Sequence, residues 1–264
     1  MSYATIAGDR IRYEVHGDGT PVVFLHGFPL SGRLWRHCIE PLRKRRRLII
    51  PDVRGLGESA GHAFATMSRY ADDVADLLNA LGEKEPVVVV GLSMGGYIAF
   101  EFMRRHADRV RGLVLADTRA NADPPQKAEE RRQQAARVLA EGTRVVVDAM
   151  MPALFGPAAS ESLKEEWRGM MNASPPEGVA AALKAMADRP DSTPTLATIR
   201  VPTLVIVGDQ DTLTPPEVSR AMHQALLDST LVIVPGSGHM LPVEKPQEFN
   251  HHLAAFLDRL RQSD

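Results

Sequence analysis

Short apolar runs alternate with stretches of helical periodicity along most of the chain, and this alternation constrains the fold more than any other feature. Continuous apolar runs such as Val87-Val88-Val89-Val90 are typical of strands that are covered on both faces. Strand-like segments, the first of them a hairpin, occupy residues 5–15, 21–25, 48–51, 87–90, 113–116, 204–207 and 231–234. Helical patterns occupy residues 68–81, 94–106, 215–227 and 244–260. The sequence therefore predicts an α/β fold in which helices flank a mostly parallel, eight-stranded sheet.

The segment from residue 119 to residue 198 breaks the alternation. It carries helical patterns at residues 129–141, 160–171 and 176–186 but no strand-like run. An all-helical insertion between two strands is most simply a cap over the sheet, here after the sixth strand. We therefore expect a core of residues 1–118 and 199–264 and a helical cap of residues 119–198. The methionines of the cap are interpreted as core filler or, alternatively, as the lining of an adaptable apolar pocket.

Composition excludes several classes of function. The 264 residues include 31 Lys and Arg against 33 Asp and Glu, so no basic excess favours nucleic acid or an anionic membrane. No apolar run approaches the roughly 18 residues of a membrane span, and the first residues lack a secretion-signal pattern, which predicts a cytoplasmic protein. A single cysteine, Cys38, allows neither an internal disulfide nor a cysteine metal site. We expect no metal and no cofactor.

A candidate nucleophile lies between the strand-like run at 87–90 and the helical pattern that follows it. Residues 91–95 read Gly-Leu-Ser-Met-Gly, which is Gly-x-Ser-x-Gly in the strand–turn–helix context that this motif requires. A serine on so tight a turn has a strained backbone, and larger residues two positions before or after it would collide with the adjacent strand and helix. The turn exposes the hydroxyl at the positive end of the helix. Ser93 is therefore the predicted nucleophile.

With this turn, the chain resembles the α/β-hydrolases over nearly its whole length, least over the cap. Two further segments carry the resemblance. Residues 26–29, His-Gly-Phe-Pro, resemble the oxyanion loop of the family, and residues 52–59, Asp-Val-Arg-Gly-Leu-Gly-Glu-Ser, resemble its Asp-x-Arg-Gly-x-Gly-x-Ser loop. The resemblance implies that the backbone N–H groups of Phe28 and Met94 form the oxyanion hole.

A serine nucleophile needs a base, and His239 is the best of nine histidines. It lies on a glycine-rich loop just after the last strand, at the carboxyl edge of the sheet where such folds assemble their sites. The family carries its catalytic histidine at the same place. His26 is interpreted instead as a structural residue whose ring hydrogen-bonds loop backbone. Surface positions are expected for His16, His37, His62, His106, His223, His251 and His252.

The acid that orients the base should lie between the serine and the histidine in the chain. Asp211, in the loop after the strand at 204–207, matches the position of the acid in the family. Two alternatives stay open at this point. Asp209 lies two residues earlier, and Asp117 follows the strand at 113–116, a position that some relatives use.

Apolar side chains near these loops define a candidate substrate pocket. Its predicted members are Leu30, Met150, Leu154, Phe155, Leu213 and Met240. Such a lining favours an uncharged acyl group of short or medium length. A dicarboxylate would need arginines in the cap, and those available, which are expected to face solvent, are Arg119, Arg131, Arg132, Arg137 and Arg144.

Two further patterns have simpler interpretations. Residues 55–60 fit the dinucleotide fingerprint Gly-x-Gly-x-x-Ala, but the next helical pattern begins only near residue 68, so a loop is favoured. The basic run at residues 43–47 is interpreted as a solvated helix end rather than a localisation signal or phosphate contact. No His-Glu-x-x-His motif occurs, which disfavours a zinc hydrolase.

Together these features predict a serine hydrolase that cleaves carboxylic esters through an acyl-enzyme on Ser93. The chain is similar to small carboxylesterases and 3-oxoadipate enol-lactonases. Alternatives are opening of an enol-lactone or acyl-homoserine lactone, then perhydrolysis or hydrolysis of a carbon–carbon bond. A ligand-binding receptor of the same fold is the non-enzymatic alternative. The expected partner is a small ester or lactone, not nucleic acid or a membrane, and the protein is expected to be a monomer or homodimer.

Overall fold

The structure, a computed structural model, describes residues 2–61 and 65–261. Within these residues a single sheet has the strand order β1-β2-β4-β3-β5-β6-β7-β8. The pairs β1–β2 and β2–β4 are antiparallel, and the other neighbouring strands are parallel. The strands are β1 Ser2–Ile6, β2 Asp9–His16, β3 Thr20–Leu25, β4 Arg46–Pro51, β5 Val87–Leu92, β6 Val110–Ala116, β7 Thr203–Gly208 and β8 Ser229–Val234. The predicted eight-stranded, mostly parallel sheet is confirmed.

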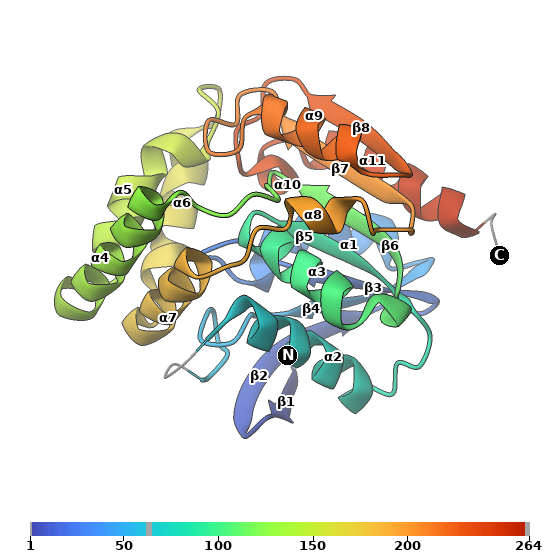
Figure 1. Cartoon of the computed structure of the whole chain (residues 1–264), viewed down its shortest axis with the longest axis horizontal. Helices are drawn as coiled ribbons and strands as arrows, with labels where there is room; N and C mark the ends of the chain where they lie inside the picture. The colour runs from blue at the N-terminus through green and yellow to red at the C-terminus, as the bar shows by residue number, and fades with distance from the viewer. Residues whose placement is uncertain (1, 62–64, 262–264) are drawn as a thin grey trace.

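Helices cover both faces of this sheet (Figure 1). Helices α2 and α3 pack against each other on one face, and α1 packs against α11 on the other. Every residue of β5 is buried, which explains its continuous apolar sequence. The core helices are α1 Arg36–Leu42, α2 Met67–Ala80, α3 Met94–Arg105, α9 Pro216–Ala225, α10 Leu241–Glu244 and α11 Pro246–Arg261.

Local signals set the ends of several of these elements. Thr66 caps α2, since its hydroxyl accepts a hydrogen bond from the Arg69 N–H at 3.0 Å. Gly82 follows α2 with a φ of 73°, a left-handed conformation that glycine adopts without a steric penalty. The end of this helix near Gly82 is therefore confirmed.

Between β6 and β7 the described chain consists of helices joined by loops and contains no strand. Helices α4 to α7 form a group at the side of the molecule opposite the C-terminus (Figure 1). These helices are α4 Pro125–Glu141, α5 Arg144–Leu154, α6 Glu161–Asn172 and α7 Pro176–Ala187, and the short helix α8 Thr193–Leu196 follows them in the chain. The predicted helices at 129–141, 160–171 and 176–186 correspond to α4, α6 and α7. The exact core and cap boundaries stay a prediction.

Some sequence interpretations were incomplete. The basic run is solvated only over residues 43–45, because Arg46 and Arg47 already belong to β4. Arg46 is buried and pairs with Asp258 of α11 at 2.7 Å, so it ties the sheet to the last helix. Residues 55–60 lie in a loop, and α2 begins only at Met67, as expected for a segment that is not a dinucleotide site.

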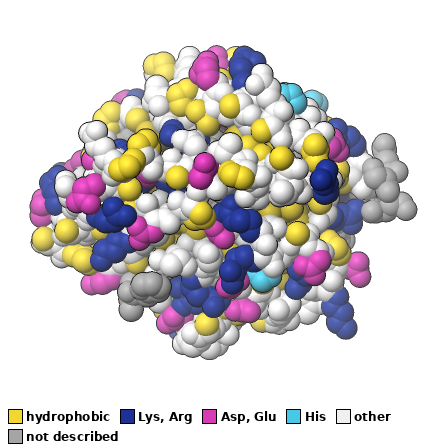
Figure 2. All heavy atoms as spheres, in the orientation of Figure 1, with side chains coloured by type: hydrophobic (Ala, Val, Ile, Leu, Met, Phe, Trp, Pro, Cys, Tyr) yellow, Lys and Arg dark blue, Asp and Glu magenta, His cyan; other side chains and the backbone are white. Residues whose placement is uncertain are grey.

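Side chains of opposite charge are interspersed on the face shown in Figure 2, in keeping with the near balance of charge in the sequence. None of the helices described here has both the length and the apolar composition that a bilayer span requires.

Candidate active site

Four neighbouring parallel strands bring the candidate residues to one edge of the sheet. The strands β5, β6, β7 and β8 lie side by side, and their carboxyl ends share one edge. Ser93 follows β5, Asp117 follows β6, Asp211 follows β7 and His239 follows β8. Residues far apart in the sequence are thus gathered by strand order alone.

Ser93 occupies the strained turn that the motif predicts. Its φ is 54° and its ψ is −114°, a conformation that costs a non-glycine residue on the order of 1–3 kcal/mol. A β-carbon added at Gly91 would lie 2.4 Å from the Gly95 carbonyl oxygen, and one added at Gly95 would lie 2.0 Å from that of Leu25. Only glycine fits at both positions, so the steric explanation of the motif is confirmed.

His239 and Asp211 are in direct contact. The distance from His239 Nδ1 to Asp211 Oδ2 is 2.8 Å, and both side chains are buried. Asp211 also accepts hydrogen bonds from the Leu213 and Thr214 N–H groups, at 2.8 Å and 2.9 Å, and from the Thr214 hydroxyl. With Nδ1 bound to the carboxylate, Nε2 is the nitrogen left to exchange a proton with a substrate or nucleophile.

These contacts keep Asp211 ionised. Burial alone would raise the pKa of this carboxyl group, but the charge and hydrogen bond of His239 and the donors of Thr214 outweigh it, and the pKa falls to about 2. Among the described residues, Ser93 Oγ makes no hydrogen bond to His239. The structure therefore contains an assembled imidazole–carboxylate pair, with the serine held at the same sheet edge.

In the described residues, neither alternative acid forms a hydrogen bond with His239. Asp117 is fully buried, and its Oδ1 accepts a hydrogen bond from the Gly208 N–H at 2.9 Å. Burial and the neighbouring Asp211 charge raise the pKa of Asp117 well above its ordinary value. Asp209 is exposed and accepts a hydrogen bond from the Gly236 N–H at 2.7 Å. The geometry thus favours Asp211 as the partner of the histidine.

The loop between β3 and α1 packs directly against the serine. A β-carbon added at Gly27 would lie 3.3 Å from Ser93 Cβ, so the backbone approaches the nucleophile as closely as glycine allows. Within the described chain, neither the Phe28 N–H nor the Met94 N–H donates a hydrogen bond to another protein group. Two unused backbone donors near the serine are what an oxyanion hole needs.

His26 fixes the shape of this loop. Its Nδ1 lies 2.8 Å from the Gly27 carbonyl oxygen, and its Nε2 accepts a hydrogen bond from the Val53 N–H at 2.8 Å. Together the two contacts define a neutral ring that donates from Nδ1. The structural interpretation of His26 is confirmed, since both partners are backbone groups of the two loops that resemble the family.

The other histidines are partly or fully exposed where they are described, and His62 lies outside the described residues. Several have side-chain partners, such as His106 with Asp72 at 2.9 Å and His16 with Glu14 at 2.6 Å. None of these contacts reaches the Ser93 turn.

The predicted pocket residues are mostly buried core residues. Leu30, Leu154, Phe155 and Met240 are buried, whereas Met150 and Leu213 pack against the core while partly exposed. Phe155 also lines a cavity of about 440 Å³ beside Gln210 and Thr212, next to the Asp211 loop.

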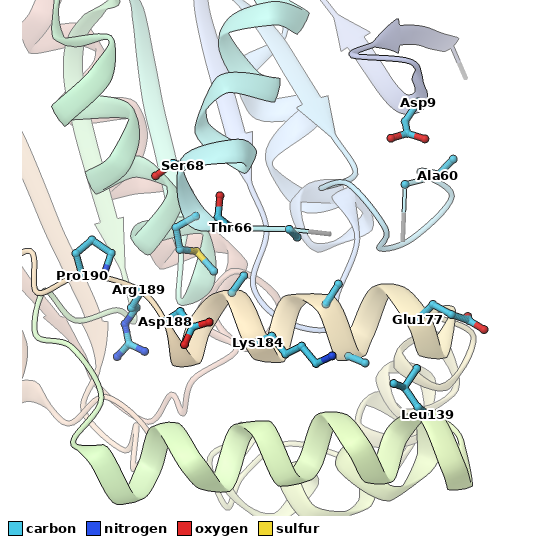
Figure 3. A pocket seen from close by; sticks show the side chains of 16 residues that line it. Asp9, Ala60, Thr66, Ser68, Leu139, Glu177, Lys184, Asp188, Arg189 and Pro190 are labelled. Carbon is cyan, nitrogen blue, oxygen red and sulfur yellow. The ribbon is translucent and has the colours of Figure 1, made fainter. Parts of the chain in front are cut away.

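A larger groove of about 980 Å³ lies elsewhere, between α7 and the start of α2 (Figure 3). It is lined by Lys184 of α7, Asp188 just after that helix, Leu139 of α4 and Asp9 at the start of β2. None of the six predicted pocket residues and none of the three candidate catalytic residues is among its lining residues.

The cap arginines divide into two groups. Arg132, Arg137 and Arg144 are largely exposed, as expected. The expectation is wrong for Arg131, which is held by Asp123 with 18% of its side chain exposed, and for Arg119, which is partly buried and donates to the Leu213 carbonyl oxygen. Arg119 is therefore the cap arginine attached to the Asp211 loop.

Sequence reasoning missed two residues that support the histidine. The Thr214 hydroxyl contacts Asp211 and lies 3.4 Å from His239 Nδ1, and the Glu244 carboxylate accepts a hydrogen bond from the Met240 N–H at 3.1 Å. Thr214 follows the acid by three residues, so its place in the same loop is a usable signal. The bonds of Glu244 depend on the tertiary fold, which residue spacing alone does not reveal.

The model of the family described as alpha/beta hydrolase fold matches residues 20–246, and the chain belongs to this family. A solved thermophilic esterase from Thermogutta terrifontis is 40% identical, covers 98% of both chains and superimposes with a TM-score of 0.95. The enol-lactonase from Burkholderia xenovorans LB400 is 26% identical over 97% of this chain and 100% of its own, with a TM-score of 0.90. The AB hydrolase superfamily protein YisY of Bacillus subtilis is 31% identical over 94% of this chain and 98% of its own.

The fold, the family and the resemblance to esterases and enol-lactonases that the sequence predicts are thereby confirmed. The names of these relatives support the predicted class of enzyme, the carboxylic ester hydrolases.

Proposed function

We propose that the protein hydrolyses carboxylic esters of short to medium acyl chain length through an acyl-enzyme on Ser93. The observation that carries this proposal is the 2.8 Å contact between His239 and Asp211 at the sheet edge that also bears the strained Ser93 turn. The 40% identity to a solved esterase over nearly the whole chain supports the same reaction.

In the first half-reaction, Ser93 Oγ attacks the ester carbonyl carbon and His239 Nε2 accepts the hydroxyl proton. Asp211 stabilises the imidazolium and holds the tautomer that donates from Nδ1. The carbonyl oxygen becomes an oxyanion, to which the Phe28 and Met94 N–H groups donate. One such donor contributes about 2.7–4 kcal/mol to transition-state stabilisation. The carbon–oxygen bond to the alcohol then breaks, and the alcohol leaves with the proton from Nε2.

In the second half-reaction, water attacks the acyl carbon of the Ser93 ester while His239 Nε2 accepts a water proton. The intermediate collapses, the bond to Ser93 Oγ breaks, and the serine recovers its proton from His239. Each step uses only groups of this chain and water.

The substrate class is inferred from apolar residues that the sequence predicts for the pocket. Leu154, Phe155 and Met240 are apolar and buried, which favours an uncharged acyl chain. Lactone opening is the second candidate, supported by the TM-score of 0.90 to a solved enol-lactonase and by Arg119, whose guanidinium group lies at the Asp211 loop.

Initial rates over a substrate panel test this proposal. The panel contains p-nitrophenyl esters of increasing acyl length, an acyl-homoserine lactone and a dicarboxylic enol-lactone. We expect the highest kcat/KM for a short or medium ester and loss of turnover in Ser93→Ala and His239→Ala. Preference for the enol-lactone by orders of magnitude would instead assign lactone opening. Absence of turnover on all substrates, with no fluorophosphonate labelling, would indicate a receptor.

A further inference from the structure

Glu244 ends the short helix α10, immediately after the loop that carries His239. Its carboxylate turns back and contacts two parts of the molecule. Oε1 accepts a hydrogen bond from the Met240 N–H at 3.1 Å and lies 3.5 Å from the Ser237 hydroxyl. Oε2 accepts a hydrogen bond from the Gly156 N–H at 2.8 Å. One carboxylate therefore joins the histidine loop to the segment that follows α5 of the cap.

The same two segments also touch through their backbones. A β-carbon added at Gly238 would lie 2.4 Å from the Gly156 nitrogen, and one added at Gly156 would lie 3.0 Å from the Gly238 nitrogen. Gly238 precedes His239 and Met240 follows it. Both neighbours of the histidine are thus held from the cap side, Gly238 by the backbone of Gly156 and Met240 through Glu244.

Among the described residues, the Glu244 carboxylate is surrounded by hydrogen-bond donors rather than by cations. In the part of the chain described here, they are backbone N–H groups and one hydroxyl, and none is a cation. Burial raises the pKa of Glu244, and the donors at Gly156, Gly238 and Met240 oppose this effect. A partly buried carboxylate without a cation is costly unless its hydrogen bonds are satisfied, so these amides are what keeps it in place.

We propose that Glu244 is a positioning residue that fixes His239 against the cap by holding the Met240 and Gly156 amides on one carboxylate. This inference rests on the proposed function, in which His239 is the base. It implies that the cap segment and the histidine move together, so that displacing either one lowers kcat. A misplacement of about 1 Å at a reacting group can cost on the order of a hundredfold in rate.

The test compares Glu244→Gln and Glu244→Ala with Glu248→Gln, which neutralises an exposed carboxylate only four residues further along the chain. Glu244→Ala removes both acceptors, and we expect kcat to fall about a hundredfold with KM within about twofold of the parent value. Glu244→Gln keeps one acceptor oxygen but presents an NH₂ group to the other donor, so we expect a loss of about tenfold. Glu248→Gln should retain the parent kcat.

A spectroscopic measurement separates positioning from a general loss of stability. The Nδ1 proton shared by His239 and Asp211 should give a downfield ¹H resonance, assigned by its absence in Asp211→Asn. We expect this resonance to shift or broaden in Glu244→Ala at a temperature where circular dichroism shows the variant fully folded. The Glu248→Gln spectrum should match that of the parent.

A substitution on the cap side tests the same contact if Glu244→Ala fails to fold. In Gly156→Ala the new methyl group would lie 2.9 Å from Gln210 Oε1 and 3.0 Å from the Gly238 nitrogen. We expect it to push the two segments apart and to lower kcat by about tenfold or more with little change in KM.

The outcomes distinguish this inference from the proposed function. If Ser93→Ala and His239→Ala abolish turnover but folded Glu244→Ala and Gly156→Ala keep kcat within about twofold of the parent, Glu244 has no positioning role. If Ser93→Ala or His239→Ala retains turnover, the proposed reaction is wrong, whatever the Glu244 variants do. A graded loss from Gln to Ala, with the resonance altered, supports the inference.

Discussion

Two buried carboxyl groups that follow neighbouring strands have pKa values shifted in opposite directions. Asp211 accepts hydrogen bonds from His239, Leu213 and Thr214. Burial would raise its pKa, but His239 and Thr214 outweigh this effect and lower the pKa to about 2. Asp117 has one backbone donor, and its Oδ2 has no partner in the described residues, so burial and the charge of Asp211 raise its pKa well above the ordinary value. The sequence left both residues open as the acid, because each follows a strand. The number of hydrogen-bond donors around each carboxylate distinguishes Asp211 from Asp117 as the candidate acid.

Asn substitutions test this difference. Asp211→Asn should lower kcat by about 10⁴-fold, because an amide opposite Nδ1 favours the wrong imidazole tautomer. Asp117→Asn keeps an oxygen for the Gly208 N–H, and asparagine tolerates the left-handed φ of 42°. We therefore expect its kcat to stay within about tenfold of the parent. Steady-state rates on one p-nitrophenyl ester measure both effects, and the reverse order would make Asp117 the acid.

We expect His26 to make the stability of the protein depend on pH. Burial is the largest influence on this ring and lowers its pKa, so the native state holds the ring neutral while the unfolded chain protonates near pH 6.5. Below about pH 6.5 the unfolded state binds a proton that the native state does not, and the free energy of unfolding should fall by up to about 1.4 kcal/mol per pH unit until the native ring protonates. Urea unfolding from about pH 5 to about pH 8 measures this slope.

The matched variant is His26→Gln, which removes the titrating group. Its free energy of unfolding should be lower at neutral pH, since the contacts to Gly27 and Val53 are weakened, but it should depend less on pH below 6.5. An unchanged slope in this variant would assign the pH dependence to other groups.

At the scale of elements, the sequence predicts a helix, strand or turn most reliably where the steric requirements of neighbouring residues determine the local conformation. The strand β5, the turn at Ser93 and the start of α3 follow from a buried valine run and glycines that leave no room for a β-carbon. The helix α5 was not predicted, because tertiary packing determines its conformation against the local preference of its residues. Its Val145-Val146-Val147 run and Pro152 disfavour a helix locally, and burial of Val146, Val147 and Leu154 in the cap outweighs that preference.

Gly95→Ala tests the steric account of the turn. The new β-carbon would lie 2.0 Å from the Leu25 carbonyl oxygen, so strand β3 or helix α3 must shift. We expect the free energy of unfolding to fall by at least about 1–3 kcal/mol, measured by urea unfolding. Gly169→Ala, in the last turn of α6 with no atom within 4 Å of the new carbon, is the control and should stabilise by up to about 1 kcal/mol. Equal effects at the two sites would contradict the account.

At the scale of the whole molecule, the helices of the predicted cap contact the predicted core through their backbones. Gly178 of α7 meets the loop after β4, where a β-carbon would lie 1.7 Å from the Gly55 carbonyl oxygen. The sequence predicts that a cap exists but not where it touches the core. Such contacts depend on how separate elements dock, and neither Gly178 nor Gly156 belongs to a motif.

Gly178→Ala should therefore move α7 away from the core. We expect a lower Tm, by several degrees for a loss of about 1–3 kcal/mol, and a change in KM that exceeds the change in kcat. Calorimetry and steady-state kinetics measure the two effects, again with Gly169→Ala as the control. An unchanged Tm in Gly178→Ala would show that α7 does not pack tightly against Gly55.

The most direct test of the account is the site of covalent modification by an ester-like probe. After reaction with a fluorophosphonate, mass spectrometry of the tryptic peptide 85–104 should place a single adduct on Ser93. Labelling should be lost in Ser93→Ala and slowed by orders of magnitude in His239→Ala. An adduct on another residue, or equal labelling in Ser93→Ala, would contradict the claim that the strained serine is the nucleophile.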